Sequence, residues 1–331
     1  MLSSCKSSSS TETKRLNLKN WANVAAYILN TFFTHGVGTA GLLGTPTNGD
    51  LSDKYQTIVT PDSGAFRIWI VIFLFQLLFT IVQLFPKFRA TPMVQEGVSY
   101  WYCIVTAMQI GWTFSFAYEI IPASLAFMLA LYASLMALLY SQYYTESDNS
   151  FVEFWLLRFP FALHGGWITA ASALNVNVQA VASSAPADMQ LALAIVCLAV
   201  LHAISVWVLF YPQRPNWTIA CVLAWAFGYI YVELASPNDL IVETFTQQTI
   251  NGVRYAAFAV GAIIIPVQLV LRMAMLVKPQ FNPYRAAGDS DSATHESETK
   301  ALSHDVDEGF VVTGATREED AKKDGDAVDM A

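Results

Sequence analysis

The chain of 331 residues is 54% hydrophobic and only 13% charged. Soluble domains carry about 25% charged residues, so this composition excludes an ordinary soluble globular domain. The net charge of −8 comes entirely from residues 279–331, which hold 5 basic and 13 acidic side chains. The acidity therefore describes the C-terminal segment and gives no information about a ligand.

Eight apolar stretches follow one another along the chain, separated by short polar loops. A helix that crosses a hydrocarbon core of about 30 Å needs roughly 20 apolar residues. The pattern predicts an all-α fold, a polytopic helical membrane protein with about eight transmembrane helices. The expected spans are residues 21–42, 65–86, 98–118, 121–143, 152–177, 187–210, 215–234 and 252–277.

The loops between these spans predict the orientation of the chain. With an even number of spans, ten Lys and Arg residues fall on the side of the termini and three on the other side. Cytoplasmic loops are the ones enriched in Lys and Arg, so we expect both termini in the cytoplasm, while the kind of membrane stays open. The polar N-terminal segment 1–19 has no apolar region typical of a secretory signal. The acidic tail 279–331 is predicted to be disordered and to be either simply solvated or a docking site for a cytosolic partner.

Four of the expected spans carry a polar and aromatic stripe at helical spacing. Membrane helices turn such groups toward one another or toward a cavity, because lipid offers them no hydrogen bonds. The stripes are Asn23, Tyr27, Asn30 and Thr34, with His35 beside them; Trp69, Gln76, Thr80 and Gln83; Tyr102, Gln109, Trp112 and Thr113; and His164, Trp167, Ala171 and Asn175. One stripe alone is typical of interhelical hydrogen bonding, whereas four together favour a lined cavity.

Other features concern helix packing and bending. Ala162, Gly166 and Ala170 form a ridge of small residues of the kind that lets two membrane helices approach closely. Pro160 and Pro266 lie inside expected spans, where proline bends a helix.

Several classes of function lack their sequence signals. No Lys lies inside a span, and HExxH, GxSxG, a P-loop and paired carboxylates at membrane depth are absent from the sequence. Three histidines, His35, His164 and His202, lie on three different spans and are better interpreted as core residues than as a metal or haem site. We expect no catalytic residues, no metal and no cofactor, and therefore no enzyme.

Three stretches in the first five spans carry a family resemblance. Phe66-Arg67-Ile68-Trp69 is similar to an FGPxW motif, Gln109-Ile110-Gly111-Trp112-Thr113 resembles N-x-x-W-[ST], and the stretch from Trp167 to Asn175 matches W-x(3)-A-[ST]-x-L-N. In this order they resemble the TspO/MBR family of tryptophan-rich sensory or translocator proteins over residues 20–178. Gln109 departs from the family's Asn, and the sterol-type pattern after the fifth span is absent.

The resemblance implies a TspO-like five-helix domain over residues 20–178, with a ligand pocket capped by the first long loop, residues 43–64. It also implies planar apolar ligands such as porphyrins. Residues 179–278, with three additional helices, have no counterpart in the five-helix family; they are expected to cover the surface by which smaller members dimerise, so a homodimer stays open. The expected ligand-binding residues are His35, Trp69, Gln76, Gln109, Trp112, His164, Trp167, Ala171 and Asn175.

The sequence therefore predicts a membrane carrier or sensory protein for a planar hydrophobic ligand, tetrapyrrole-like or lipid-like, surrounded by membrane lipids and without a nucleic-acid partner. The alternative is an ion-coupled secondary transporter that uses all eight helices. In that case the polar residues of the last three spans would join the pathway, namely Gln190, His202, Ser205, Gln268 and Arg272.

Overall fold

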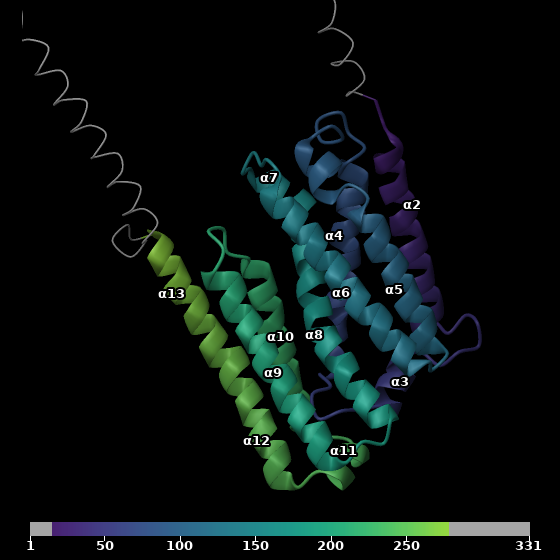
Figure 1. Cartoon of the computed structure of the whole chain (residues 1–331), viewed down its shortest axis with the longest axis vertical. Coiled ribbons are helices and arrows are strands. Elements are labelled where there is room, and N and C mark those ends of the chain that lie inside the picture. Colours follow the sequence, from purple (N-terminus) through teal and green to yellow (C-terminus); the bar gives the residue numbers. More distant parts are fainter. Residues whose placement is uncertain (1–14, 278–331) are drawn as a thin grey trace, which may run out of the picture. The chain divides into compact units, whose positions relative to one another are not determined.

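The computed structural model describes residues 15–277, and every regular element in this range is a helix (Figure 1). The predictions for the acidic tail 279–331 and for most of segment 1–19 lie outside the described residues. The long helices are α2 (Leu18–Phe33), α4 (Ile68–Val82), α5 (Trp101–Ala117), α6 (Ile121–Tyr144), α8 (Phe159–Ala182), α9 (Ala187–Phe210), α10 (Trp217–Glu233), α12 (Gln247–Phe258) and α13 (Ile265–Val277).

Short helical segments complete the chain at the ends of these helices and in the loops. They are η1 (Thr34–Thr39), α3 (Asn48–Lys54), η2 (Ser63–Arg67), η3 (Met93–Val98), α7 (Phe151–Glu153), η4 (Phe154–Arg158), α11 (Asp239–Thr244) and η5 (Ala259–Ile264). Helices α12, η5 and α13 run on without interruption, so each expected span corresponds to one helical run.

Within the described residues, four helical runs are long and apolar enough to cross a membrane: Ser63–Val82, Ile121–Tyr144, Ala187–Phe210 and Gln247–Val277. Helix α10 is apolar but shorter. Helices α2, α5 and α8 also carry polar stripes, and α5, with 17 residues, is short for a crossing. The prediction of a polytopic helical membrane protein is thus supported, and the count of eight crossings stays a prediction.

Five helices close into a ring, which we call the five-helix ring. Helix α2 contacts α4 and α5, α6 contacts α5 and α8, and α8 contacts α4, so the order around the ring is α2, α4, α8, α6, α5. Figure 1 shows these helices running side by side. Their inward side chains form one hydrophobic core, centred on residues such as Phe79, Tyr102 and Phe161.

The remaining helices pack on the outer side of α8. Helices α9 and α10 both contact α8, and α10 also contacts α12. The predicted ridge of small residues makes this contact possible: a Cβ atom on Gly166 would stand 2.9 Å from Cβ of Val222 and 3.2 Å from Cα of Ile219, both on α10. The hydrophobic residues of this second group form a core of their own around Leu223 and Phe227.

Both prolines inside spans follow a segment with wide π-type turns. Segment η4 ends two residues before Pro160, and η5 ends two residues before Pro266. Proline has no N–H for the helical ladder, and its ring displaces the preceding turn. The sequence predicted a bend at each proline, and the structure has wide turns directly before both of them.

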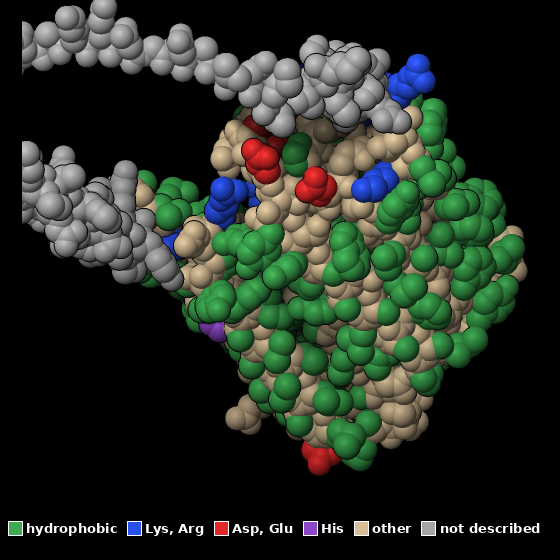
Figure 2. All heavy atoms as spheres, turned by 45° about the horizontal axis from the view of Figure 1, so that its top comes forward, with side chains coloured by type: hydrophobic (Ala, Val, Ile, Leu, Met, Phe, Trp, Pro, Cys, Tyr) green, Lys and Arg blue, Asp and Glu red, His purple; other side chains and the backbone are tan. Residues whose placement is uncertain are grey.

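The surface agrees with a membrane environment. Figure 2 shows acidic and basic side chains gathered at the end of the bundle where α2 begins, while the flank in view is covered by hydrophobic side chains. Large apolar residues such as Ile70, Val196 and Val270 are exposed. Apolar exposure on this scale is typical of a surface that contacts lipid or protein.

Candidate ligand-binding site

A hydrogen-bonded polar cluster lies inside the five-helix ring. The phenol of Tyr102 on α5 donates to Oε1 of Gln76 on α4 at 3.2 Å, and the amide nitrogen of Gln76 lies 3.0 Å from Nδ1 of His164 on α8. All three side chains are 0% exposed. The second ring nitrogen of His164, Nε2, has no hydrogen-bond partner among residues 15–277.

A second polar cluster joins α5 to the first helix. The amide nitrogen of Gln109 lies 3.5 Å from the hydroxyl of Thr34, which donates to Oδ1 of Asn30 at 3.2 Å. Within the described part of the chain, Oε1 of Gln109 and Nδ2 of Asn30 find no partner. Gln109 follows Tyr102 by seven residues on α5, so both clusters face the ring interior from the same side of that helix.

Aromatic rings lie beside these clusters. The indole of Trp69 stands edge-on to the imidazole of His164, with 5.6 Å between ring centroids, and 5.8 Å from Phe73 one turn further along α4. The ring of His35 lies 4.7 Å from Phe73 on its other side. Trp69 is half-buried, whereas His35 is exposed.

Two further tryptophans connect α8 to its neighbours. The indole nitrogen of Trp112 donates to Oδ1 of Asn175 at 3.1 Å, and the same indole stacks on Phe116 at 5.4 Å. The ring of Trp167 meets that of Phe66, just before α4, edge-on at 5.5 Å. Both tryptophans are buried.

Loop 1 (residues 43–64) is tied to the turn between α5 and α6. The carboxylate of Glu119 accepts a hydrogen bond of 2.6 Å from the phenol of Tyr55 and pairs with the ammonium of Lys54. These two bonds hold the pKa of Glu119 below its ordinary value, and the bond to Glu119 raises the pKa of Lys54. Glu119 itself adopts a left-handed backbone with φ of 57°, which is uncommon for a non-glycine residue.

The part of loop 1 that follows Tyr55 is bound to α10. The backbone N–H of Asp62 donates to the carbonyl of Tyr229 at 3.1 Å, and the amide of Gln56 donates to the carboxylate of Glu233. Directly after the loop, the carbonyl of Ala65 accepts a bond of 3.2 Å from the indole of Trp225. The sequence had no local signal for these contacts, because they join residues more than 150 positions apart.

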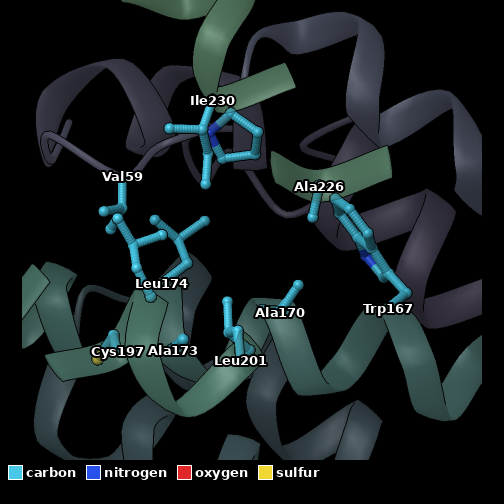
Figure 3. A pocket seen from close by; sticks show the side chains of 12 residues that line it. Val59, Trp167, Ala170, Ala173, Leu174, Cys197, Leu201, Ala226 and Ile230 are labelled. Carbon is cyan, nitrogen blue, oxygen red and sulfur yellow. The ribbon is translucent and has the colours of Figure 1, made fainter. Parts of the chain in front are cut away.

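An apolar pocket lies between α8, α9, α10 and loop 1 (Figure 3). It takes in about 400 Å³ of space between atoms when the open space at its mouth is counted, and about 20 Å³ of this admits the centre of a water-sized sphere. Its lining consists of Val59, Pro61, Trp167, Ala170, Ala171, Ala173, Leu174, Cys197, Leu198, Leu201, Ala226 and Ile230. The side chains labelled in Figure 3 converge on this space from three helices and the loop.

Comparison with known proteins places these features in a family. The model of the TSPO-like protein family matches residues 20–277. The chain belongs to the TSPO-like protein family. Among the curated proteins and among the solved structures, none matches.

Membership in the TSPO-like family confirms the resemblance found in the first five spans, and the match also includes the three C-terminal helices. The family and the four long apolar helices together indicate a multi-pass membrane protein with a ligand-binding or sensory role. The comparisons give no support to an ion-coupled transporter.

The predicted site residues of this TSPO-like protein fall into four groups. Trp69, Gln76 and His164 come together, with His35 reached through Phe73. Gln109 belongs to the cluster with Thr34, and Trp112 pairs with Asn175. Trp167 and Ala171 line the pocket between α8, α9 and α10.

Proposed function

We propose that this TSPO-like protein is a membrane carrier or sensor that binds a planar hydrophobic ligand, tetrapyrrole-like in shape and polarity, inside the five-helix ring. The site is placed between α2, α4, α5 and α8, at the end of the ring near loop 1. Its chemistry is binding and release, with no covalent step.

The observation that carries the proposal is the pair of buried polar clusters with free hydrogen-bonding atoms. Nε2 of His164, Oε1 of Gln109 and Nδ2 of Asn30 are buried and have no partner within the described chain. A buried donor or acceptor without a partner costs about 1–3 kcal/mol. A ligand with a polar edge would satisfy such atoms, which is how a few polar groups orient a ligand in a mostly apolar site.

The aromatic side chains supply the complementary surface. Trp69 stands next to His164, and Trp112 is positioned by its hydrogen bond to Asn175. Indole rings offer large apolar faces that favour offset or edge-on contact with another flat ring. A flat ligand is therefore favoured over a compact or flexible one at this position.

Access to the polar clusters requires movement. Gln76, Gln109 and His164 are fully buried, so a ligand reaches them only when part of the surrounding structure opens. Loop 1 lies outside the ring helices, and its contacts with Glu119 and α10 hold it in place. We therefore assign the opening step to loop 1.

The test is titration of the purified full-length protein with protoporphyrin IX, followed by the shift of the porphyrin absorbance band. Saturable binding by the native protein is expected. Loss of one hydrogen bond to the ligand in Gln109→Leu or His164→Leu should weaken binding about ten-fold, the factor that corresponds to 1.4 kcal/mol. Trp69→Phe should also weaken it, by loss of aromatic contact.

Matched controls use residues of the same type on the surface. Trp207→Phe on α9 and Gln248→Leu on α12 change exposed side chains and should leave the titration unchanged. The proposal is wrong if the native protein shows no saturable binding, or if the three ring variants bind as tightly as the controls.

A further inference from the structure

The pocket between α8, α9 and α10 differs chemically from the interior of the five-helix ring. Its lining is apolar apart from the thiol of Cys197 and the indole N–H of Trp167. We propose that this pocket is a second binding site, which takes a hydrocarbon chain such as the acyl chain of a fatty acid or of a membrane lipid. The proposal does not depend on the planar ligand in the ring.

The lining selects a ligand portion without polar atoms. A polar group brought into a site with few hydrogen-bond partners loses its bonds to water without compensation, so a porphyrin carboxylate or an amide would leave most of its hydrogen-bonding atoms unpaired there. Hydrocarbon is the one common biological ligand chemistry that needs no such partner. The alanines on α8 and α10, Ala170, Ala173 and Ala226, keep the helices close and leave a narrow space that suits a chain better than a ring system.

The exposure of the lining shows where a chain would enter. The side chains that keep partial exposure all come from α8 and α9, and they are Ala170, Ala171, Ala173, Leu174, Cys197 and Leu198. Those contributed by loop 1 and α10 are buried, including Pro61 and Ala226. The pocket is thus closed by loop 1 and α10 and open between α8 and α9, along the flank where apolar side chains are exposed.

Trp167 separates the two sites. One part of its indole lines the pocket, and its ring contacts Phe66 in η2, just before α4. Variants of Trp167 would therefore disturb both sites, and the test below leaves this residue unchanged.

The first experiment uses the full-length protein in lipid nanodiscs and a fatty acid that carries a photoactivatable diazirine on its chain. Cross-linked residues are mapped by mass spectrometry. We expect cross-links in the lining residues of α8 and α9 that an excess of unlabelled palmitate abolishes, namely Ala170, Ala171, Ala173, Leu174, Cys197, Leu198 and Leu201. Cross-links spread evenly over the exposed residues of α9, such as Val196 and Val200, and insensitive to palmitate would overturn the proposal.

A variant that fills the pocket provides the second test. Ala226→Leu adds a branched side chain to the buried wall, and Ala199→Leu, at an exposed position on α9, is its matched control. Because each methylene that a chain no longer buries weakens its binding several-fold, displacement of two should reduce the competition by palmitate about ten-fold. A folded Ala226→Leu protein that competes like the control contradicts the proposal.

A thiol measurement keeps the test independent of folding defects. In a protein with Cys5→Ser, Cys103→Ala and Cys221→Ala, Cys197 is the single remaining cysteine. Saturating palmitate should slow the alkylation of Cys197 by N-ethylmaleimide, and an unchanged rate would count against the site.

A comparison of two probes shows whether the bound hydrocarbon chain belongs to a free fatty acid or to a membrane lipid. Labelling by the photoactivatable fatty acid alone identifies a free fatty acid as the ligand. Equal labelling by a phosphatidylcholine with the same diazirine chain identifies a membrane lipid, whose headgroup remains outside the opening between α8 and α9. Failure of porphyrin titration would leave either result intact, so the two proposals fail separately.

Discussion

Trp112 and Asn175 connect the third and fifth long helices of the ring through a hydrogen bond of 3.1 Å from the indole nitrogen to the amide oxygen. Asn175 also donates to the carbonyl of Ala171 one turn earlier at 2.9 Å. The amide is thus oriented by its own helix before it accepts from the indole.

The first prediction concerns this pair. Trp112→Phe keeps an aromatic ring and removes the donor, so it should lower the free energy of unfolding by about 0.6 kcal/mol, the typical value for an interhelical bond in a membrane protein. Unfolding by SDS in mixed micelles measures the change. The double variant that also carries Asn175→Ala should lose less unfolding free energy than the two single variants lose together. If the losses of the single variants add up fully in the double variant, the bond contributes nothing.

The second prediction uses two glycines with opposite surroundings. Gly166→Ala places a Cβ atom 2.9 Å from Cβ of Val222, and overpacking of this kind costs about 1–3 kcal/mol. Gly228→Ala on α10 places its Cβ where no atom lies within 4 Å, so the helix-propensity gain of about 1 kcal/mol should appear. The unfolding temperature of Gly166→Ala should therefore be lower than that of Gly228→Ala. A higher unfolding temperature for Gly166→Ala than for Gly228→Ala would mean that α8 and α10 are not packed as described.

The third prediction concerns the pH dependence of loop 1. The pKa of Glu119 is lowered by its bonds to Lys54 and Tyr55, so its contribution is present above the ordinary value of 4.5 and is lost as the pH falls through the lowered pKa. The pKa of Lys54 is raised, so its contribution is present below its ordinary value of 10.5 and is lost as the pH rises beyond it. The tether should therefore be intact between these two values.

The measurement is proteolysis at Lys54. Trypsin near neutral pH should cut after Lys54 faster in Glu119→Gln than in the native protein, because the variant lacks the charge that holds the ammonium. Glu243→Gln, at an exposed position on α11, is the matched control. Hydrogen exchange of loop 1 at pH 7 should be slower in the native protein than in Glu119→Gln, and exchange that is equally fast in both proteins would disprove the tether.

The fourth prediction concerns the contact between loop 1 and α10. Trp225→Phe removes the donor to the carbonyl of Ala65, so backbone amides around residues 61–66 should exchange faster with deuterium. Trp207→Phe, which changes an exposed residue of α9, should leave their exchange unaffected. Protection that survives in Trp225→Phe would assign the anchoring of this segment to the backbone bond between Asp62 and Tyr229 alone.

The positions of the helices could be predicted from the sequence because hydrophobic length is a local property. The polar stripes also indicated the inward faces correctly: Asn30, Gln76, Gln109 and His164 are all fully buried. Helical spacing shows which residues share a face of the helix. In a membrane, a polar face almost always points toward the interior of the bundle.

The sequence was less informative about which helix each face of α8 contacts, because the spacing of residues along one helix does not identify the helices around it. Helix α8 is contacted by α4, α6, α9 and α10, so its periodicity cannot tell that Ala171 faces the apolar pocket while Asn175 faces α5. His35 lies in the wide turns of η1, where the regular angle between successive side chains no longer holds. The role of His35 in binding stays a prediction, as do the roles of the other candidate residues.

The tethers of loop 1 have a consequence for the order in which the chain assembles. During synthesis, α8 is complete before α9 and α10 emerge, so the five-helix ring can close first and Glu119 can already hold Lys54. The bonds from Trp225 and Tyr229 form only after α10 has been inserted beside Gly166. A nascent chain that stops after α8 therefore lacks every bond from α10 to loop 1, and the contacts of Lys54 and Tyr55 with Glu119 are the ones left to it.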